Sequence, residues 1–117
     1  RMMAEVPKAD VIITNPTEYA VALRYNMAEM NAPVVIAKGQ RLTAQRIREL
    51  GEKHHVPIVQ KPELARVLFR TVDLNQSIPE TLFHAVAEIL SFVYGIDRRA
   101  EKIRERQWLM RDLRTAV

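Results

Sequence analysis

The sequence contains no cysteine, only three glycines and no long apolar run. Without cysteine the chain can form no disulfide and no catalytic thiolate, and a reducing compartment fits this composition best. Three scattered glycines cannot build a glycine-rich phosphate loop. The longest apolar stretches, such as Pro33–Ala37 and Ile89–Tyr94, are far too short to span a bilayer. These absences exclude a disulfide scaffold, a thiol enzyme and a P-loop nucleotide-binding protein.

Residue types that could carry metal or serine chemistry are present but scattered. His54, His55 and His84 have no nearby cluster of carboxylates, and Ser77 and Ser91 have no base at a triad-like spacing. We therefore expect no metal, no cofactor and no enzyme that turns over a separate substrate.

The positive charge is concentrated at the C-terminal end. Residues 97–117 hold seven Lys and Arg against four Asp and Glu, whereas the rest of the chain holds eleven against ten. Nucleic-acid-binding domains usually carry a basic face on the fold itself, so this distribution argues against a nucleic-acid partner. We expect three parts: a linker from an absent membrane region (1–10), a globular domain (11–96) and a basic helical tail (97–117).

Four short apolar runs, separated by turns and amphipathic patterns, predict an α/β fold in which helices flank a four-stranded mixed sheet. In the second run Tyr19, Val21 and Leu23 alternate with alanines, so one face should be bulky and the other tightly covered. Lys38 and Gly39 should end the third run. The expected strands are Val11–Thr14, Tyr19–Tyr25, Pro33–Ala37 and Val56–Val59.

Between and after these strands the apolar spacing becomes helical. Leu42 and Ile47 lie roughly in phase within a predicted helix from 42 to 54, which would join two parallel strands. Pro62 begins a second predicted helix, at a position where its missing N–H is tolerated. A third helix is expected over Pro79–Tyr94.

The junction between the first two expected strands carries an Asn-Pro step, which is a strong turn signal. In the usual reaction of asparagine, the next backbone nitrogen attacks the side-chain carbonyl, but proline has no N–H and closes that route. The reverse attack remains open. The side-chain nitrogen of Asn15 attacks the backbone carbonyl carbon of Asn15, forms a succinimide and expels Pro16 as a new amino terminus. From the residues alone, the step is either an ordinary turn or a self-cleavage site.

Self-cleavage has local requirements that the neighbouring residues can be tested against. Asn15 must be extended, which Pro16 favours, and its side-chain nitrogen must be held near the carbonyl carbon. The carbonyl oxygen needs hydrogen-bond donors, and some group must take a proton. Thr17 and Glu18 are the local candidates for these polarising and proton-handling roles. The predicted catalytic residues are therefore Asn15, Pro16, Thr17 and Glu18.

The run from Asn15 to Tyr25 closely resembles the Asn-Pro-Thr-His signature of the type III secretion export-switch family, and its later residues are similar to the flagellar branch. The resemblance covers roughly residues 5–96. Further runs in family order are Lys8–Ile12, Ala32–Gly39, Ile47–Glu49, Val56–Val59, Leu64–Arg66 and Ile78–Glu80.

The resemblance implies a domain on the cytoplasmic face of the bacterial inner membrane, tethered through an absent upstream transmembrane region. It implies a single autocleavage in cis between Asn15 and Pro16, with the two fragments staying together as neighbouring strands. It further implies a switch of export from rod and hook substrates to filament substrates. The implied partners are export-gate membrane and cytoplasmic components, a hook-length control protein and exported flagellar subunits.

The chain departs from the family pattern at one position, where Glu18 replaces the histidine. An ionised glutamate can accept a proton from the attacking amide, but it has none to donate and does not stabilise an oxyanion. We therefore expect cleavage to persist with an altered rate and pH dependence. Two other interpretations stay open: an uncleaved docking or scaffold domain with a structural Asn-Pro turn, and a small nucleic-acid-binding module that uses the basic tail.

Overall fold

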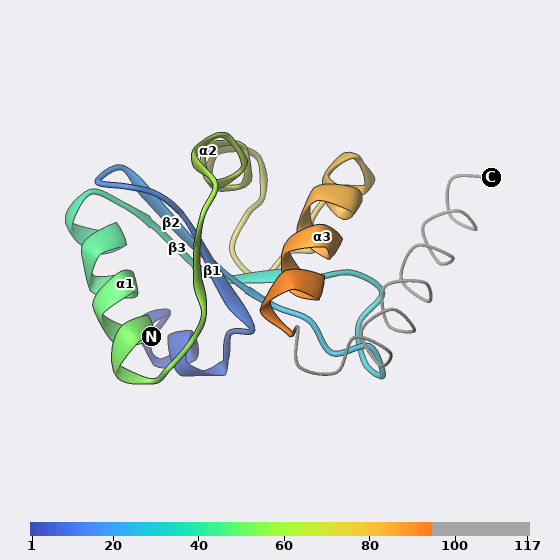
Figure 1. Ribbon diagram of the computed structural model, residues 1–117, viewed down its shortest axis with the longest axis horizontal. Coiled ribbons are helices and arrows are strands. Elements are labelled where there is room, and N and C mark those ends of the chain that lie inside the picture. The colour runs from blue at the N-terminus through green and yellow to red at the C-terminus, as the bar shows by residue number, and fades with distance from the viewer. Residues whose placement is uncertain (95–117) are drawn as a thin grey trace.

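The computed structural model describes residues 1–94, in which helices cover both faces of a mixed sheet (Figure 1). The predicted tail, 97–117, lies outside the described residues. The sheet has four strands in the order β3-β2-β1-β4. In chain order the elements are the 3-10 helix η1 (Met3–Lys8), β1 (Val11–Asn15), β2 (Tyr19–Arg24), β3 (Val34–Gln40), α1 (Leu42–Lys53), β4 (Ile58–Gln60), α2 (Pro62–Thr71), the 3-10 helix η2 (Glu80–Leu82) and α3 (Phe83–Val93).

Strand β1 lies inside the sheet rather than at its edge. It pairs antiparallel with β2 on one side and parallel with β4 on the other. Because β3 is antiparallel to β2, β3 and β4 run in the same direction, as the sequence predicts. They are not neighbours, however, since β2 and β1 lie between them.

Strand β3 is longer at its C-terminal end than the sequence indicates. Lys38 pairs with Val21, and Gly39 pairs with Ala20, so the strand continues to Gln40. The prediction that Lys38 and Gly39 end this strand is therefore wrong. Pairing with β2 keeps these residues extended, although polar residues and glycine favour a strand end locally.

The two faces of β2 differ as predicted. Tyr19, Val21 and Leu23 belong to the core beneath α2 and α3. Ala20 and Ala22 belong to the opposite core, beneath α1 and η1. The small alanine side chains let that helical layer approach the sheet closely, because only a methyl group separates the backbones.

Helix α1 packs on the sheet through small and branched residues. Its buried residues are Ala44, Ile47 and Gly51, whereas Leu42 is 77% exposed, so the predicted apolar stripe is wrong at its first position. A Cβ added at Gly51 would lie 2.3 Å from Cδ1 of Ile12, which shows how closely the helix approaches β1.

The first ten residues, predicted as a linker, are packed against the domain. They contain η1, whose Val6 is fully buried in the core beneath α1.

At the C-terminal end of the described residues, the predicted helix start at Pro79 is displaced: η2 follows Pro79, and α3 begins at Phe83. Within residues 1–94, no helix combines the length and the apolar composition needed to cross a membrane.

Candidate functional site

The Asn-Pro step forms the tight turn of the β1–β2 hairpin. Asn15 is the last residue of β1 and pairs with Tyr19, the first residue of β2. Proline at the second turn position and a φ of 70° at Thr17 are the features of a type II turn. The backbone N–H of Glu18 closes the turn by donating to the carbonyl oxygen of Asn15 at 3.0 Å.

This hydrogen bond lies on the carbonyl group that self-cleavage would attack. Asn15 is extended because it belongs to β1, and its carbonyl oxygen already has a donor in the Glu18 N–H. A donor at that oxygen stabilises the negative charge that develops there during attack. The sequence indicated the side chain of Glu18 as a candidate for polarising the carbonyl or handling the proton. The backbone contact was missed, although the Asn-Pro step marks a turn, and in a β-turn the N–H of the fourth residue often donates to the carbonyl of the first.

The remaining predicted site residues lie at the surface. Pro16 and Thr17 are exposed, so a new amino terminus at Pro16 would face solvent. The positive φ of Thr17 is uncommon for a β-branched residue and indicates local backbone strain. The structure therefore brings all four predicted residues into one turn, with Asn15 half-buried at its inner end.

Arg41 also contacts this turn, although no sequence motif pointed to it. Its backbone N–H donates to the carbonyl oxygen of Glu18 at 2.8 Å, and its Nε lies 3.8 Å from the Glu18 carboxylate. The β2–β3 register brings the two segments together, because Tyr19 pairs with Gln40 immediately before Arg41. The contact joins residues that are distant in sequence, so local spacing could not reveal it.

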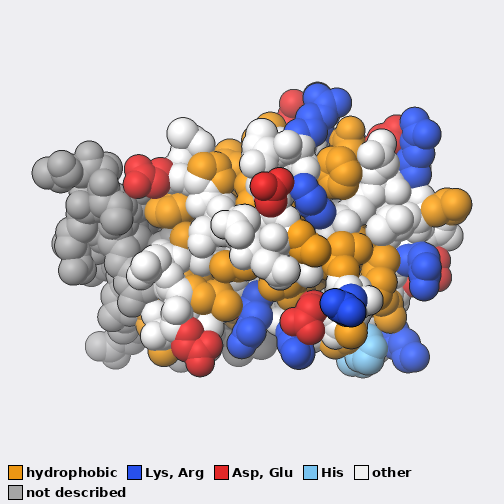
Figure 2. Space-filling model, turned by 180° about the vertical axis from the view of Figure 1, so that it is seen from behind, with side chains coloured by type: hydrophobic (Ala, Val, Ile, Leu, Met, Phe, Trp, Pro, Cys, Tyr) orange, Lys and Arg blue, Asp and Glu red, His pale blue; other side chains and the backbone are white. Residues whose placement is uncertain are grey.

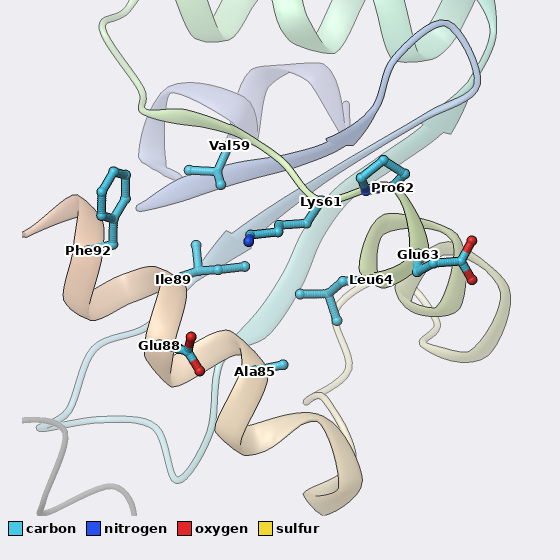
Figure 3. A pocket seen from close by; sticks show the side chains of 9 residues that line it. All are labelled: Val59, Lys61, Pro62, Glu63, Leu64, Ala85, Glu88, Ile89 and Phe92. Atoms are coloured by element: carbon cyan, nitrogen blue, oxygen red, sulfur yellow. The ribbon is translucent and has the colours of Figure 1, made fainter.

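A separate apolar groove lies between α3 and the segment where β4 leads into α2 (Figure 3). Its volume is about 810 Å³. None of its lining residues belongs to the Asn-Pro turn. Phe92, which is 77% exposed, stands at one end beside Val59. The lining residues are Val59, Lys61, Pro62, Glu63, Leu64, Ala85, Glu88, Ile89 and Phe92.

Charged side chains of both signs are intermixed on the face shown in Figure 2. Among residues 1–94, no group of three His, Cys, Asp or Glu side chains is placed to hold a metal ion. The described part of the chain thus presents neither the basic patch of a nucleic-acid interface on this face nor a metal centre.

Residues 1–93 match the model of a protein family described as the FlhB HrpN YscU SpaS Family. The chain belongs to this family. It is 58% identical over 98 residues to the flagellar biosynthetic protein FlhB of Yersinia enterocolitica, a match that covers 84% of this chain and 26% of the relative. Its identity to FlhB of Salmonella typhimurium is 54% over 98 residues, with the same coverage of both chains. The chain thus spans about a quarter of the length of these curated relatives.

Two solved structures share the fold. The cytoplasmic domain of FlhB from Shewanella putrefaciens aligns with a TM-score of 0.79 and 48% identity, covering 89% of this chain and 79% of that one. A mutated C-terminal domain of EscU aligns with a TM-score of 0.77 and 31% identity, covering 82% and 94%. The family resemblance and the four-stranded mixed sheet predicted from the sequence are confirmed.

Proposed function

We propose that this chain is the cytoplasmic substrate-specificity switch of a flagellar type III protein export apparatus, and that it cleaves itself once between Asn15 and Pro16. The observation that carries the cleavage proposal is the hydrogen bond from the Glu18 N–H to the Asn15 carbonyl oxygen, at 3.0 Å. This bond polarises the carbonyl of an extended asparagine that is followed by proline. Family membership supports the export role.

The proposed reaction exchanges one carbon–nitrogen bond for another and moves one proton between the two nitrogens. Nδ2 of Asn15 bonds to the carbonyl carbon of Asn15, and the bond from that carbon to the Pro16 nitrogen breaks. The proton lost by Nδ2 reaches the Pro16 nitrogen, with the Glu18 carboxylate as its carrier. The products are a succinimide at residue 15 and a secondary amine at residue 16. Thr17 lies at the third position of this turn with a φ of 70°, and the local strain that this conformation stores would be released by cleavage.

The export role places the domain at the cytoplasmic face of the inner membrane, tethered through an upstream transmembrane region. Its partners would be export-gate membrane and cytoplasmic components, a hook-length control protein and exported flagellar subunits. Cleavage would remove the covalent connection between β1 and β2, and the surface around the turn would change. The export apparatus would then accept filament subunits in place of rod and hook subunits.

Intact-mass measurement of the purified chain tests the cleavage directly. We expect two fragments, residues 1–15 and 16–117. Their combined mass should equal that of the unbroken chain while residue 15 is a succinimide, and exceed it by one water after the succinimide hydrolyses. Asn15→Ala should remain a single species because it has no attacking amide. A wild-type chain that stays unbroken after prolonged incubation at raised pH and temperature would refute the cleavage proposal.

The apolar groove between α3 and the segment where β4 leads into α2 favours a second candidate, an uncleaved docking domain. An apolar hollow of about 810 Å³ with the exposed Phe92 at its rim is typical of a binding surface. Under this alternative the Asn-Pro turn is structural. An unbroken backbone together with loss of export in a groove variant such as Ile89→Glu would favour it.

A further inference from the structure

We propose that Arg41 is a positioning residue for self-cleavage and acts through Glu18. This inference rests on the proposed cleavage function. Arg41 lies at the junction between β3 and α1, next to the Asn-Pro turn. Its guanidinium would hold the Glu18 carboxylate in place beside the turn and offset its negative charge during the reaction.

Three local preferences disfavour an arginine at this position. Its backbone dihedrals, φ 55° and ψ −115°, lie in a region that glycine occupies far more readily than other residues. It is also the N-cap of α1, where Ser, Thr, Asp, Asn or Gly are preferred, and it makes no side-chain cap hydrogen bond. A cation at a helix N-terminus further opposes the helix dipole. Residues that break local rules in this way tend to mark functional sites.

The contacts of Arg41 show what an arginine adds here. Its backbone N–H donates to the Glu18 carbonyl oxygen at 2.8 Å, and a glycine would keep this bond. The contact that glycine would lose is the ion pair, in which Nε lies 3.8 Å from the Glu18 carboxylate. Any specific contribution of Arg41 to cleavage must therefore come from its side chain and not from its backbone.

The ion pair between Arg41 and Glu18 can affect the energy of the cleavage transition state. Negative charge develops on the Asn15 carbonyl oxygen, which accepts a hydrogen bond from the N–H of Glu18. The same residue carries a carboxylate, and an anion near the developing charge raises the energy of the transition state. Arg41 offsets this repulsion while leaving the carboxylate able to accept a proton. Both side chains are partly exposed, at 76% for Arg41 and 45% for Glu18, so the effect is moderate.

The experiment measures the rate of cleavage of the full chain after a pulse of cell-free synthesis, with intact mass as the readout. Arg41→Gly should slow cleavage about threefold to fivefold, the upper end of the range expected for loss of an exposed ion pair. Arg41→Lys restores the cation and should cleave within about twofold of the wild-type rate. In the uncleavable Asn15→Ala background, Arg41→Gly should raise the unfolding temperature, because it relieves the backbone strain. A purely structural role would not slow cleavage while stabilising the fold.

Two further measurements show whether Arg41 acts through Glu18. In a Glu18→Gln background, Arg41→Gly should change the rate less than about twofold, because no carboxylate remains to be offset. High salt should shrink the difference between wild type and Arg41→Gly, since exposed charges are screened. An equal loss of rate in both backgrounds would overturn the positioning role.

The outcomes separate this inference from the function on which it rests. If the wild type cleaves and Arg41→Gly cleaves at the same rate, the inference about Arg41 is wrong and the cleavage proposal stands. If no protein with an intact Asn15-Pro16 step cleaves, the cleavage proposal is wrong and the inference falls with it.

Discussion

The hydroxyl of Tyr94 donates a hydrogen bond to the carboxylate of Asp10, which joins the end of α3 to the residue just before β1. The other carboxylate oxygen of Asp10 accepts the backbone N–H of Tyr25 at 2.7 Å. One side chain upstream of the Asn-Pro turn thus holds two elements downstream of it. Any cleavage at the turn would leave this connection in place.

Removing the tyrosine hydroxyl should weaken the fold. We expect Tyr94→Phe to lower the free energy of unfolding by about 1.5–3 kcal/mol, the range for a hydrogen bond to a charged group. Urea denaturation of the two proteins measures the difference. In an Asp10→Asn background the same substitution should have a smaller effect, and an equal effect in both backgrounds would contradict the proposed coupling.

The ammonium group of Lys38 caps the C-terminal end of α2. Nζ donates to the carbonyl oxygens of Phe69 and Val72, both at 2.9 Å, and lies 5.2 Å from the centre of the Phe69 ring. Lys38→Met keeps the apolar stem and removes these donors, so it should lower the free energy of unfolding by about 1–2 kcal/mol. Lys8→Met is the matched control, because Lys8 forms an exposed ion pair with Glu5 within the described residues, and its loss should change stability little.

The close approach of α1 to β1 predicts a compensating pair of substitutions. A Cβ at position 51 would lie 2.3 Å from Cδ1 of Ile12, whose side chain is fully buried. Gly51→Ala should therefore destabilise the domain by about 1–3 kcal/mol, despite the better helix propensity of alanine. Ile12→Val removes that Cδ1, so Gly51→Ala should be neutral or stabilising in its presence. Thermal unfolding of the four proteins tests this, and destabilisation that persists in the double variant would contradict it.

Replacing Pro16 should redirect the chemistry of Asn15. Pro16→Gly restores a backbone N–H, which can attack the side-chain carbonyl and deamidate the asparagine. We expect this variant to accumulate the mass change of deamidation and to show much less backbone cleavage than wild type. Time-resolved intact-mass spectra measure both products. Unchanged cleavage without deamidation would mean that proline does not direct the reaction.

Cleavage should alter backbone protection mainly around residues 14–19. The cut removes one covalent bond at the turn, while the pairs Val11–Leu23 and Ile13–Val21 remain buried within the sheet. Hydrogen exchange of cleaved wild type and uncleaved Asn15→Ala should therefore differ at the turn and agree in the rest of β1 and β2. Identical exchange at the turn after confirmed cleavage would refute this expectation.

Local chemistry made much of the fold predictable. The alternation of Tyr19 and Val21 with alanines identified both faces of β2, because side-chain direction in a strand has a period of two. The Asn-Pro step identified the hairpin turn for a similar reason, since the restrictions imposed by Pro16 act within the neighbouring residues. Lys38 and Gln40 escaped prediction because only their pairing with β2 makes them strand residues.

In the candidate site too, some features depend on neighbouring residues and others on strand pairing. Asn15, Pro16, Thr17 and Glu18 are adjacent in sequence, so a motif could identify them together. The contact with Arg41 depends on how β3 aligns with β2, and the donor at the Asn15 carbonyl is a backbone group. The Arg41 contact leaves no local pattern in the sequence, whereas the backbone donor follows from the turn that the Asn-Pro step marks. Strand register and main-chain geometry, rather than residue type, complete this site.

Cutting the turn would make folding a reaction between two chains instead of one, because β1 lies inside the sheet and must stay paired there for the domain to persist. The chain before Pro16 would then be a separate polypeptide inserted between β2 and β4, and the domain would become a heterodimer of its own two pieces. Its unfolding midpoint would rise with protein concentration, as it does for any assembly held by mass action. The uncut domain would show no such dependence. A dilution series of thermal melts would therefore distinguish the two states without any measurement of mass.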